Sequence, residues 1–333
     1  MKLSDIGEFG FIQRISLPFL KNIPSAFVGI GDDCAVIPWE EDSSLLVTTD
    51  MLIEDVHFIR SKISPRDLGY KSLAVNLSDI AAMGGSPESA YLSLGIPKDV
   101  DVEWLDEFYF GLRELTESEN IYLLGGDTTK SPNQIVINIT VLGKANPLFI
   151  KYRSMAKQGD IICVTDFIGD SGGGFRCLQE SIPLDDDVMY LLQRHHRPRA
   201  HLAEGAWLAM QKGVHAMMDV SDGIDSDLHH IMDRSLCGAE VQTEHLPISP
   251  QLQNTSNQFG WQTKEIAVTG GEDYCLLTTI APDQFHAISE EFIAKFNRPL
   301  SNIGMAVDRK LGLKYYENGK QFELQKHGFD HFV

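Results

Sequence analysis

Aspartates beside small residues recur along this chain of 333 residues, and their type and spacing are suited to binding metal ions. Four segments combine an apolar run with such an Asp: VGIGDDCAVI (28–37), LLVTTD (45–50), LLGGDTTK (123–130) and MMDVSDGI (217–224). If each run is a buried strand, a carboxylate at its end is costly unless it is paired or coordinates a metal ion. Strand ends meet at one edge of an α/β sheet, where ligands bind, so we expect these carboxylates to converge there.

Two further acidic segments have the same character. VTGGEDY (268–274) sets two acids behind a pair of glycines, and NLSDIAAMG (76–84) places Asp79 near the end of an expected helix. Glycines here let the backbone approach a phosphate closely and expose N–H donors. Ligand sets made only of oxygen favour Mg²⁺ or Ca²⁺ over zinc or copper. One such segment is usually only a turn, but six together predict a site for divalent cations and phosphate.

The net charge agrees with phosphate binding through metal ions. Lys and Arg total 28 against 47 Asp and Glu, which gives a formal charge of −19. Nucleic-acid binding depends on a basic surface, so we expect no nucleic-acid partner. An acidic protein also repels phosphates unless cations lie between the two. The chain lacks G-x-x-x-x-G-K-[ST] and the protein-kinase signature set, which excludes two common ways of binding ATP.

Cysteine spacing and hydropathy indicate a soluble, cytoplasmic protein. The five cysteines form no C-x-x-C pair, so neither a zinc ribbon nor a disulfide framework is predicted. Reduced thiols fit the cytosol best. The first 15 residues are too polar for a signal peptide, and no run of 18 apolar residues occurs. We therefore expect no association with a membrane.

Short strands alternate with helices, so the sequence predicts an α/β (α+β) fold, and its length predicts two domains. A helix over 65–83 is marked by Ser64 at its N-cap and Pro65 after it. The other expected helices cover 101–118, 171–180, 199–212 and 222–235, and the expected strands cover 45–50, 121–127, 135–142, 160–165, 215–220, 265–269 and 274–280. A predicted turn divides the domains into 1–147 and 148–333.

Four polar features are open to two interpretations each. Arg153 suits bidentate contact with a phosphate, although a surface ion pair is the alternative. Lys71 could neutralise a phosphate or be a solvated lysine on a helix. The run GDSGGGF (169–175) is typical of a phosphate loop, but a helix-entry turn without a ligand explains it equally well. His195 and His196 lack the spacing of metal ligands, and we expect them at the surface or on a helix face.

Eight stretches span nearly the whole chain and carry a resemblance as a set. They are GEFGFI (7–12), GIGDDCAV (29–36), TTDMLIEDVHF (48–58), YKSLAVNLSDIAAMG (70–84), LLGGDTT (123–129), DVSDGIDSDL (219–228), TGGEDY (269–274) and GFDHF (328–332). In this order they resemble the thiamine-monophosphate kinase family, within the superfamily of aminoimidazole ribonucleotide synthetase and selenophosphate synthetase. No stretch is long, so the combination at compatible spacings makes the resemblance specific.

The resemblance implies an N-terminal mixed-sheet domain that binds ATP and Mg²⁺ and dimerises through its sheet, followed by a C-terminal α/β domain. ATP and several Mg²⁺ ions would lie between the domains. The implied activity is direct in-line phosphoryl transfer from ATP to thiamine monophosphate, which gives thiamine diphosphate without a phospho-enzyme intermediate. Catalysis would depend on positioning and metal ions. The implied partners are ATP, thiamine monophosphate and a second copy of the chain.

Motif by motif, the resemblance also assigns roles to residues of this chain. The implied metal ligands are Asp33, Thr48, Thr49, Asp50, Asp79, Asp127, Asp219 and Asp222. The implied nucleotide contacts are Tyr109, Gly126, Asp127, Arg153 and Ser221, of which Tyr109 rests on spacing alone. The implied substrate contacts are His57, Glu272 and Phe329, the last at a position where a different aromatic residue is common.

Two alternatives stay open on the sequence. One is another ATP-dependent enzyme of the superfamily, although a selenophosphate synthetase would need a reactive Cys near its N-terminus, and residues 1–25 contain none. The other is a non-catalytic protein that binds Mg²⁺ or Ca²⁺, although the chain has no D-x-[DN]-x-[DN]-G calcium loop. Metal-dependent binding of ATP would separate an enzyme from a scaffold.

Overall fold

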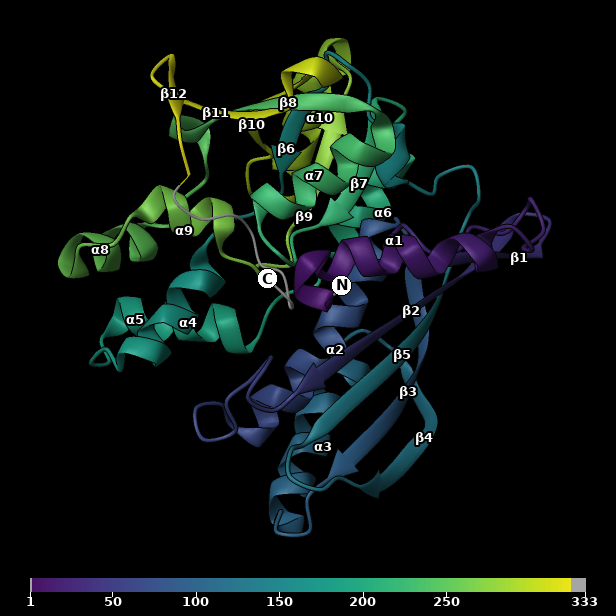
Figure 1. Cartoon of the computed structure of the whole chain (residues 1–333), viewed down its shortest axis with the longest axis vertical. Coiled ribbons are helices and arrows are strands. Elements are labelled where there is room, and N and C mark those ends of the chain that lie inside the picture. Colours follow the sequence, from purple (N-terminus) through teal and green to yellow (C-terminus); the bar gives the residue numbers. More distant parts are fainter. Residues whose placement is uncertain (1, 325–333) are drawn as a thin grey trace.

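The computed structural model describes residues 2–324, which form two sheets with helices packed around them (Figure 1). The first sheet has the order β1-β2-β5-β3-β4 and is mixed, because β3 and β4 run parallel while its other neighbours are antiparallel. Its strands are β1 (Ala35–Glu40), β2 (Ser43–Ile53), β3 (Ser86–Ile96), β4 (Tyr122–Lys130) and β5 (Val136–Ala145). Strand β4 is therefore an edge strand.

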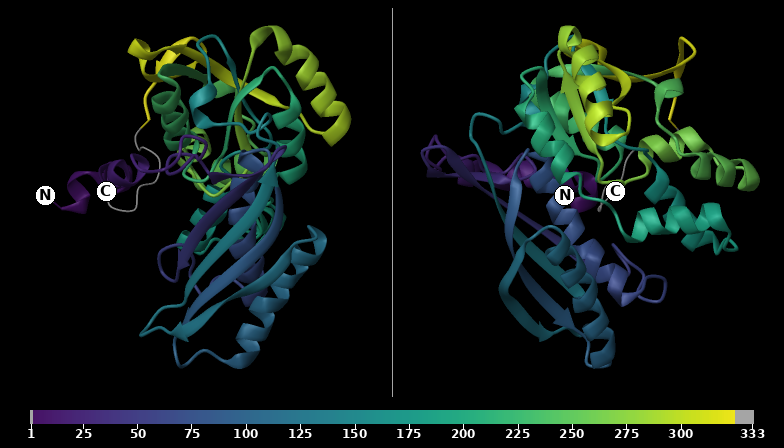
Figure 2. Two further views of the ribbon diagram at one scale, coloured as in Figure 1. Left: turned by 90° about the vertical axis from the view of Figure 1, so that its right-hand side faces the viewer. Right: turned by 180° about the vertical axis from the view of Figure 1, so that it is seen from behind.

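Helices α2 (Pro65–Ala82) and α3 (Val102–Ser118) cover one face of this sheet, whereas α1 (Gly7–Leu20) extends away from it (Figure 2). The start of α2 follows the predicted capping, since the Ser64 hydroxyl accepts the backbone N–H of Asp67 and Pro65 occupies the first turn. Most residues of α2 are buried. It packs on strands of the first sheet on one side and on parts of the second half of the chain on the other.

The second sheet has the order β12-β11-β8-β10-β6-β9-β7. Its strands are β6 (Ile161–Val164), β7 (Val214–Asp219), β8 (Cys237–Gln242), β9 (Leu276–Ile280), β10 (Ser301–Asp308), β11 (Leu313–Glu317) and β12 (Lys320–Phe322). The helices around it are α4 (Asp170–Glu180), α5 (Asp186–His196), α6 (Leu202–Met210), α7 (Ile224–Ser235), α8 (Pro250–Phe259), α9 (Thr263–Thr269) and α10 (Pro282–Phe296). Short 3₁₀ helices cover Leu3–Asp5, Arg153–Met155, Thr243–His245 and Arg309–Leu311.

The predicted two-domain α/β fold is confirmed, with each sheet carrying its own core. The predicted strand over 265–269 is wrong, because this segment belongs to α9. Its apolar residues Ala267 and Val268 are buried as part of a helix face, which a short apolar run does not distinguish from a strand. The boundary between 147 and 148 falls in the connection between the two sheets and stays a prediction.

No helix within residues 2–324 has the length and apolar character needed to cross a membrane. The five cysteines are free thiols, and all of them are buried.

Glycines allow α2 to approach its neighbours closely. A Cβ atom at Gly111 of α3 would overlap the carbonyl oxygen of Arg66, and one at Gly69 of α2 would overlap that of Phe108. The two helices thus meet backbone to backbone at a reciprocal pair of glycines. On the other side, a Cβ at Gly205 of α6 would overlap the carbonyl oxygen of Ala81. Helix α2 is therefore clamped between both halves of the molecule.

We predict that Gly111→Ala lowers the free energy of unfolding by about 1–3 kcal/mol or more, because the added methyl group forces α3 away from α2. Chemical denaturation measures this change. Gly95→Ala on β3 is the matched control, since its Cβ would make only ordinary contacts with Val136 and Ser131. Equal effects of the two substitutions would contradict the proposed backbone contact.

Candidate active site

Three carboxylates meet at the junction of the two sheets. Asp33 lies before β1, Asp79 near the end of α2 and Asp219 at the end of β7, and one oxygen of each lies within 4.8 Å of the others. Asp33 Oδ2 is buried and has no hydrogen-bond donor among the residues that the structure describes. Like charges this close repel strongly in a buried site. An all-carboxylate donor set with an unsatisfied oxygen fits a hard divalent cation.

Neighbouring groups hold these carboxylates in place. The Ser78 hydroxyl of α2 donates to Asp219 Oδ2 at 2.6 Å, and the Thr48 hydroxyl of β2 donates to Asp79. The guanidinium of Arg153 donates to Asp33 Oδ1 at 2.6 Å. Each contact except that of Thr48 with Asp79 joins the first half of the chain to the second, so docking of the two halves assembles the cluster.

Burial and mutual repulsion change the acidity of the cluster. Burial, followed by the charge of Asp33, raises the pKa of Asp50 to about 6 and that of Asp219 to about 8. Burial and the charge of Asp50 raise the pKa of Asp79 well above its ordinary value. A bound cation would relieve the same repulsion by neutralising the charge, without protonating the carboxylates.

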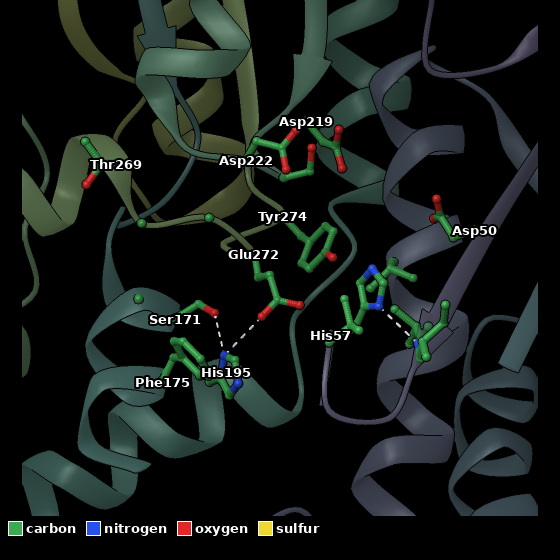
Figure 3. Close-up of a pocket in the computed structure, with 18 of the residues that line it drawn as sticks. Asp50, His57, Ser171, Phe175, His195, Asp219, Asp222, Thr269, Glu272 and Tyr274 are labelled. Atoms are coloured by element: carbon green, nitrogen blue, oxygen red, sulfur yellow. Dashed lines mark hydrogen bonds and ion pairs between the residues drawn. The ribbon is translucent and has the colours of Figure 1, made fainter. Parts of the chain in front are cut away.

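A cavity of about 970 Å³ opens beside the cluster (Figure 3). One end is acidic and is lined by Asp50, Asp79, Asp219 and Asp222. The other end is lined by Ser171 and Phe175 of α4, His195 of α5 and Glu272 of the loop between α9 and β9, while Tyr274 of the same loop lies between the two ends. One cavity therefore offers a place for metal-bound phosphates and a separate place for an organic group.

The loop over 270–274 links the two ends of the cavity. Glu272 and Tyr274 have left-handed backbones, with φ values of 63° and 52°, which are strained for residues other than glycine. The strain is offset by two bonds to the segment after β7: Glu272 N–H donates to Ser221 at 2.7 Å, and Tyr274 N–H donates to Val220 at 2.9 Å. The loop that presents Glu272 is thus fastened to the segment that presents Asp219 and Asp222.

Two residues whose positions the sequence left open lie in this site: Lys71, for which a solvated lysine was one of two interpretations, and His195, which was expected at the surface or on a helix face. Lys71 of α2 is buried, and its Nζ lies 3.0 Å from Glu272 Oε1. His195 is also buried, with its Nδ1 2.9 Å from Ser171 Oγ. Lys71 precedes Ser78 by seven residues, so the two share one face of the helix. That spacing was a usable signal, whereas nothing in the sequence alone indicates that His195 faces the cavity.

The glycine-rich run over 169–175 forms the start of α4, where a carboxylate of the protein itself accepts the free backbone N–H groups. The backbone N–H groups of Gly169 and Ser171 donate to the carboxylate of Asp273, at 2.5 and 3.0 Å. These donors at the start of α4 are thus occupied by the protein itself. Of the two interpretations of this run, the structure therefore supports a helix-entry turn without a ligand rather than a phosphate-binding loop.

Comparisons with known proteins agree along the whole chain. Residues 31–145 match the family described as AIR synthase related protein, N-terminal domain. The chain is 37% identical over 332 residues to a thiamine-monophosphate kinase of Haemophilus influenzae, with 98% of both chains covered, and 35% identical over 331 residues to that of Bacillus subtilis, with 98% of this chain and 99% of the relative covered. The chain belongs to the thiamine-monophosphate kinase family.

Solved structures of that family match the fold as well. A structure described as AaThiL complexed with AMPPCP and TMP is 33% identical, with a TM-score of 0.86 and coverage of 100% of this chain and 99% of the other. The thiamine-monophosphate kinase of Stenotrophomonas maltophilia is 34% identical, with a TM-score of 0.76 and coverage of 95% and 98%.

Most residues to which the thiamine-monophosphate kinase resemblance gave a role lie at the cavity or the cluster. The cavity wall contains Thr49, Asp50, His57, Asp79, Asp219, Ser221, Asp222 and Glu272. Asp33 belongs to the cluster, and Thr48 and Arg153 bond to its members. Phe329 lies outside the described residues.

The expected convergence at one sheet edge is wrong. Asp33 precedes a strand, Asp50 lies inside β2 and Asp79 lies on a helix, while Asp219 alone of the cluster ends a strand. The acids meet between two sheets because α2 packs on both of them. A sequence pattern predicts where acids lie along each strand or helix. It does not predict how two domains dock, and here the docking brings the acids together.

Gly126, Asp127 and Tyr109 are not brought to the cavity of the same chain. Along neighbouring strands, Asp127 lies opposite Ser93, Ser93 opposite Asn138, and Asn138 opposite Met51 of β2. Three strand spacings of about 4.8 Å therefore place Asp127 about 14 Å from β2. Tyr109 lies on α3, where its ring packs edge-on against Phe108.

Gly126 has a conformational reason to be glycine. Its φ is 151°, and a Cβ would overlap the carbonyl oxygen of Leu92 on β3. Pairing of β4 with β3 therefore requires glycine at this position, whatever else Gly126 contacts.

We predict that Mg²⁺ stabilises the protein more strongly as pH rises from 7 to 8.5. Asp79 and Asp219 have raised pKa values, so in this range the folded protein holds protons that the unfolded chain has released. Without metal, stability should therefore fall with rising pH, by up to about 1.4 kcal/mol per pH unit for each such proton. Burial lowers the pKa of His195 and of His196, which gives the opposite slope below pH 6.5 and sets the lower limit of the window.

Thermal denaturation with Mg²⁺ or with a chelator at each pH measures this effect. In Asp219→Asn the chelator curve should flatten and the benefit of Mg²⁺ should shrink. A constant Mg²⁺ effect across the window would contradict a cation site at the cluster.

Proposed function

We propose that this protein transfers the γ-phosphate of ATP to thiamine monophosphate and so forms thiamine diphosphate. The observation that carries the proposal is a single cavity that joins a buried carboxylate cluster to an end lined by Glu272, His195 and Phe175. Family membership supports it. So does the relative at 33% identity, which is described in complex with both AMPPCP, an analogue of ATP, and TMP.

Mg²⁺ is the cation proposed for the cluster. Asp33, Asp79 and Asp219 would hold it, with Asp50 and Asp222 beside them on the cavity wall. The resemblance adds Thr48, Thr49 and Asp127 as further ligands. When bound, the cations neutralise phosphate charge and help to align the attacking oxygen with the γ-phosphorus.

Residues of the chain itself position the carboxylates and the phosphates. Ser78 and Thr48 orient two of the carboxylates through their hydroxyl groups. Arg153 pairs with Asp33 at the cluster, where its guanidinium can also contact the phosphates of ATP. A phosphate monoester has a second pKa of about 6, so the acceptor is largely deprotonated near neutral pH. No strong general base is required.

The acceptor is proposed to contact His57, Glu272 and Phe329. His57 Nδ1 accepts the backbone N–H of Ile53 at 3.0 Å, so in the neutral ring Nε2 carries the proton. In Figure 3, Glu272 lies between His195 and His57, with Asp50 beyond His57. The role of Phe329 rests on the resemblance.

We propose that the protein is a homodimer built on β4. Every residue of this edge strand is exposed, including Tyr122 and Leu124 at 62% each. An exposed apolar edge is prone to pairing with another chain. A partner packed here would explain why Gly126, Asp127 and Tyr109, proposed to contact nucleotide or metal, lie away from the cavity of their own chain. The protein would act in the cytoplasm, where its free thiols stay reduced.

We predict that the protein phosphorylates thiamine monophosphate but not free thiamine. The metal end of the cavity binds phosphate, and thiamine has none, so its kcat/KM should be at least about a hundredfold lower, or ~2.7 kcal/mol in the barrier. A coupled assay with ATP and Mg²⁺ measures both acceptors. Asp50→Asn should reduce turnover more than about tenfold, whereas Asp42→Asn, on an exposed turn, should not. Comparable rates for both acceptors would contradict the proposal.

We predict that Asp127 serves the cavity of the partner chain. Light scattering should give the mass of two chains. Heterodimers of Asp79→Asn and Asp127→Asn chains, purified with two tags, carry both changes in one cavity and neither in the other. They should recover about half of the unaltered activity, while each variant alone is inactive. Inactive heterodimers, or a monomeric mass, would contradict the shared site.

A further inference from the structure

Lys71 is a buried cation that joins the two domains at the cavity. Its side chain is 1% exposed, and its Nζ lies 3.0 Å from Oε1 and 3.1 Å from Oε2 of Glu272, 201 residues further along the chain. Lys71 belongs to α2, and Glu272 belongs to the strained loop after α9. The ion pair therefore spans the junction between the first and the second half of the protein.

Packing alone does not explain a lysine at this place. Taking an ammonium group out of water costs several kcal/mol, and replacing a buried ion pair with apolar side chains is often neutral or stabilising. Leu68 and Ala74, three residues before and after Lys71 on the same face of α2, are apolar and fully buried. An apolar residue at position 71 would suit this helix face as well, so the charge itself must have a use.

Glu272 is a side chain whose direction needs fixing. Its backbone is held by the bond to Ser221, but its side chain keeps three rotatable bonds and is 27% exposed beside a cavity of about 970 Å³. Its carboxylate also contacts His195, with Nδ1 3.3 Å from Oε2. His195 is in turn held by Ser171 (Figure 3).

We propose that Lys71, by holding both carboxylate oxygens of Glu272 across the domain junction, is the positioning residue that orients Glu272 toward the organic part of the acceptor. This inference rests on the proposed function. Because α2 also carries Ser78 and Asp79, the same helix sets the metal end and the organic end of the cavity. Docking of the domains then assembles both ends together.

The test is Lys71→Met, which keeps the length of the side chain, fills the buried space and removes the charge. KM for thiamine monophosphate should rise about tenfold, while kcat and KM for ATP change less than about twofold. The melting temperature should stay the same or rise, because an unpaired Glu272 can reach water. Calorimetric titration of thiamine monophosphate, with Mg²⁺ and AMPPCP present, should show the same tenfold loss of affinity. Lys62→Met, at an exposed position, is the control and should change nothing.

A double-mutant cycle separates positioning from a structural role. If Lys71 acts through Glu272, Lys71→Met should change KM for thiamine monophosphate less than twofold when added to Glu272→Gln. Three results would each overturn the inference. The first is a double variant in which the two effects on KM for thiamine monophosphate multiply, and the second is an unchanged KM for thiamine monophosphate in Lys71→Met. The third is a Lys71→Met protein with a lower melting temperature and equal changes in KM for thiamine monophosphate and for ATP. An unaltered protein that does not phosphorylate thiamine monophosphate would instead overturn the proposed function, and the inference with it.

Discussion

Mutual repulsion among buried carboxylates is the constraint on which the rest of this structure depends. Asp33, Asp79 and Asp219 come from three elements and meet within 4.8 Å, and burial together with their charges raises the pKa of Asp79 and Asp219. Such a cluster opposes folding unless a proton or a cation neutralises it. The protein tolerates this cost where its domains join, which gives phosphate-bearing ligands a reason to bind there through metal ions.

Helix α2 is the element that makes the cluster possible. It is buried on both sides and approaches its neighbours at Gly69 and at Gly205 of α6. Along one face it presents Lys71, Ser78 and Asp79 to the second half of the chain. Packing, metal binding and orientation of Glu272 thus share one rigid helix, and a shift of that helix would disturb all three.

Many elements of the fold and many residues of the cavity wall could be predicted from the sequence, because the patterns that mark them lie within short segments of the chain. Capping by Ser64 and Pro65 marks the start of α2, and short motifs identify most residues of the cavity wall. Contacts over long separations could not be predicted in this way. The burial of Lys71 depends on a partner 201 residues away, and the acids meet between two sheets rather than at one edge. The 14 Å between Asp127 and β2 likewise follows from strand order, which no motif encodes.

The most direct measurement is a crystal structure of the protein with Mn²⁺, AMPPCP and thiamine monophosphate, with the metal located by anomalous scattering. We expect Mn²⁺ to be coordinated by carboxylate oxygens of Asp33, Asp79 and Asp219, at about the 2.1 Å typical of small hard cations, with phosphate oxygens completing its shell. Metal bound elsewhere, with the three carboxylates bonded to one another through protons, would contradict the central role of the cluster.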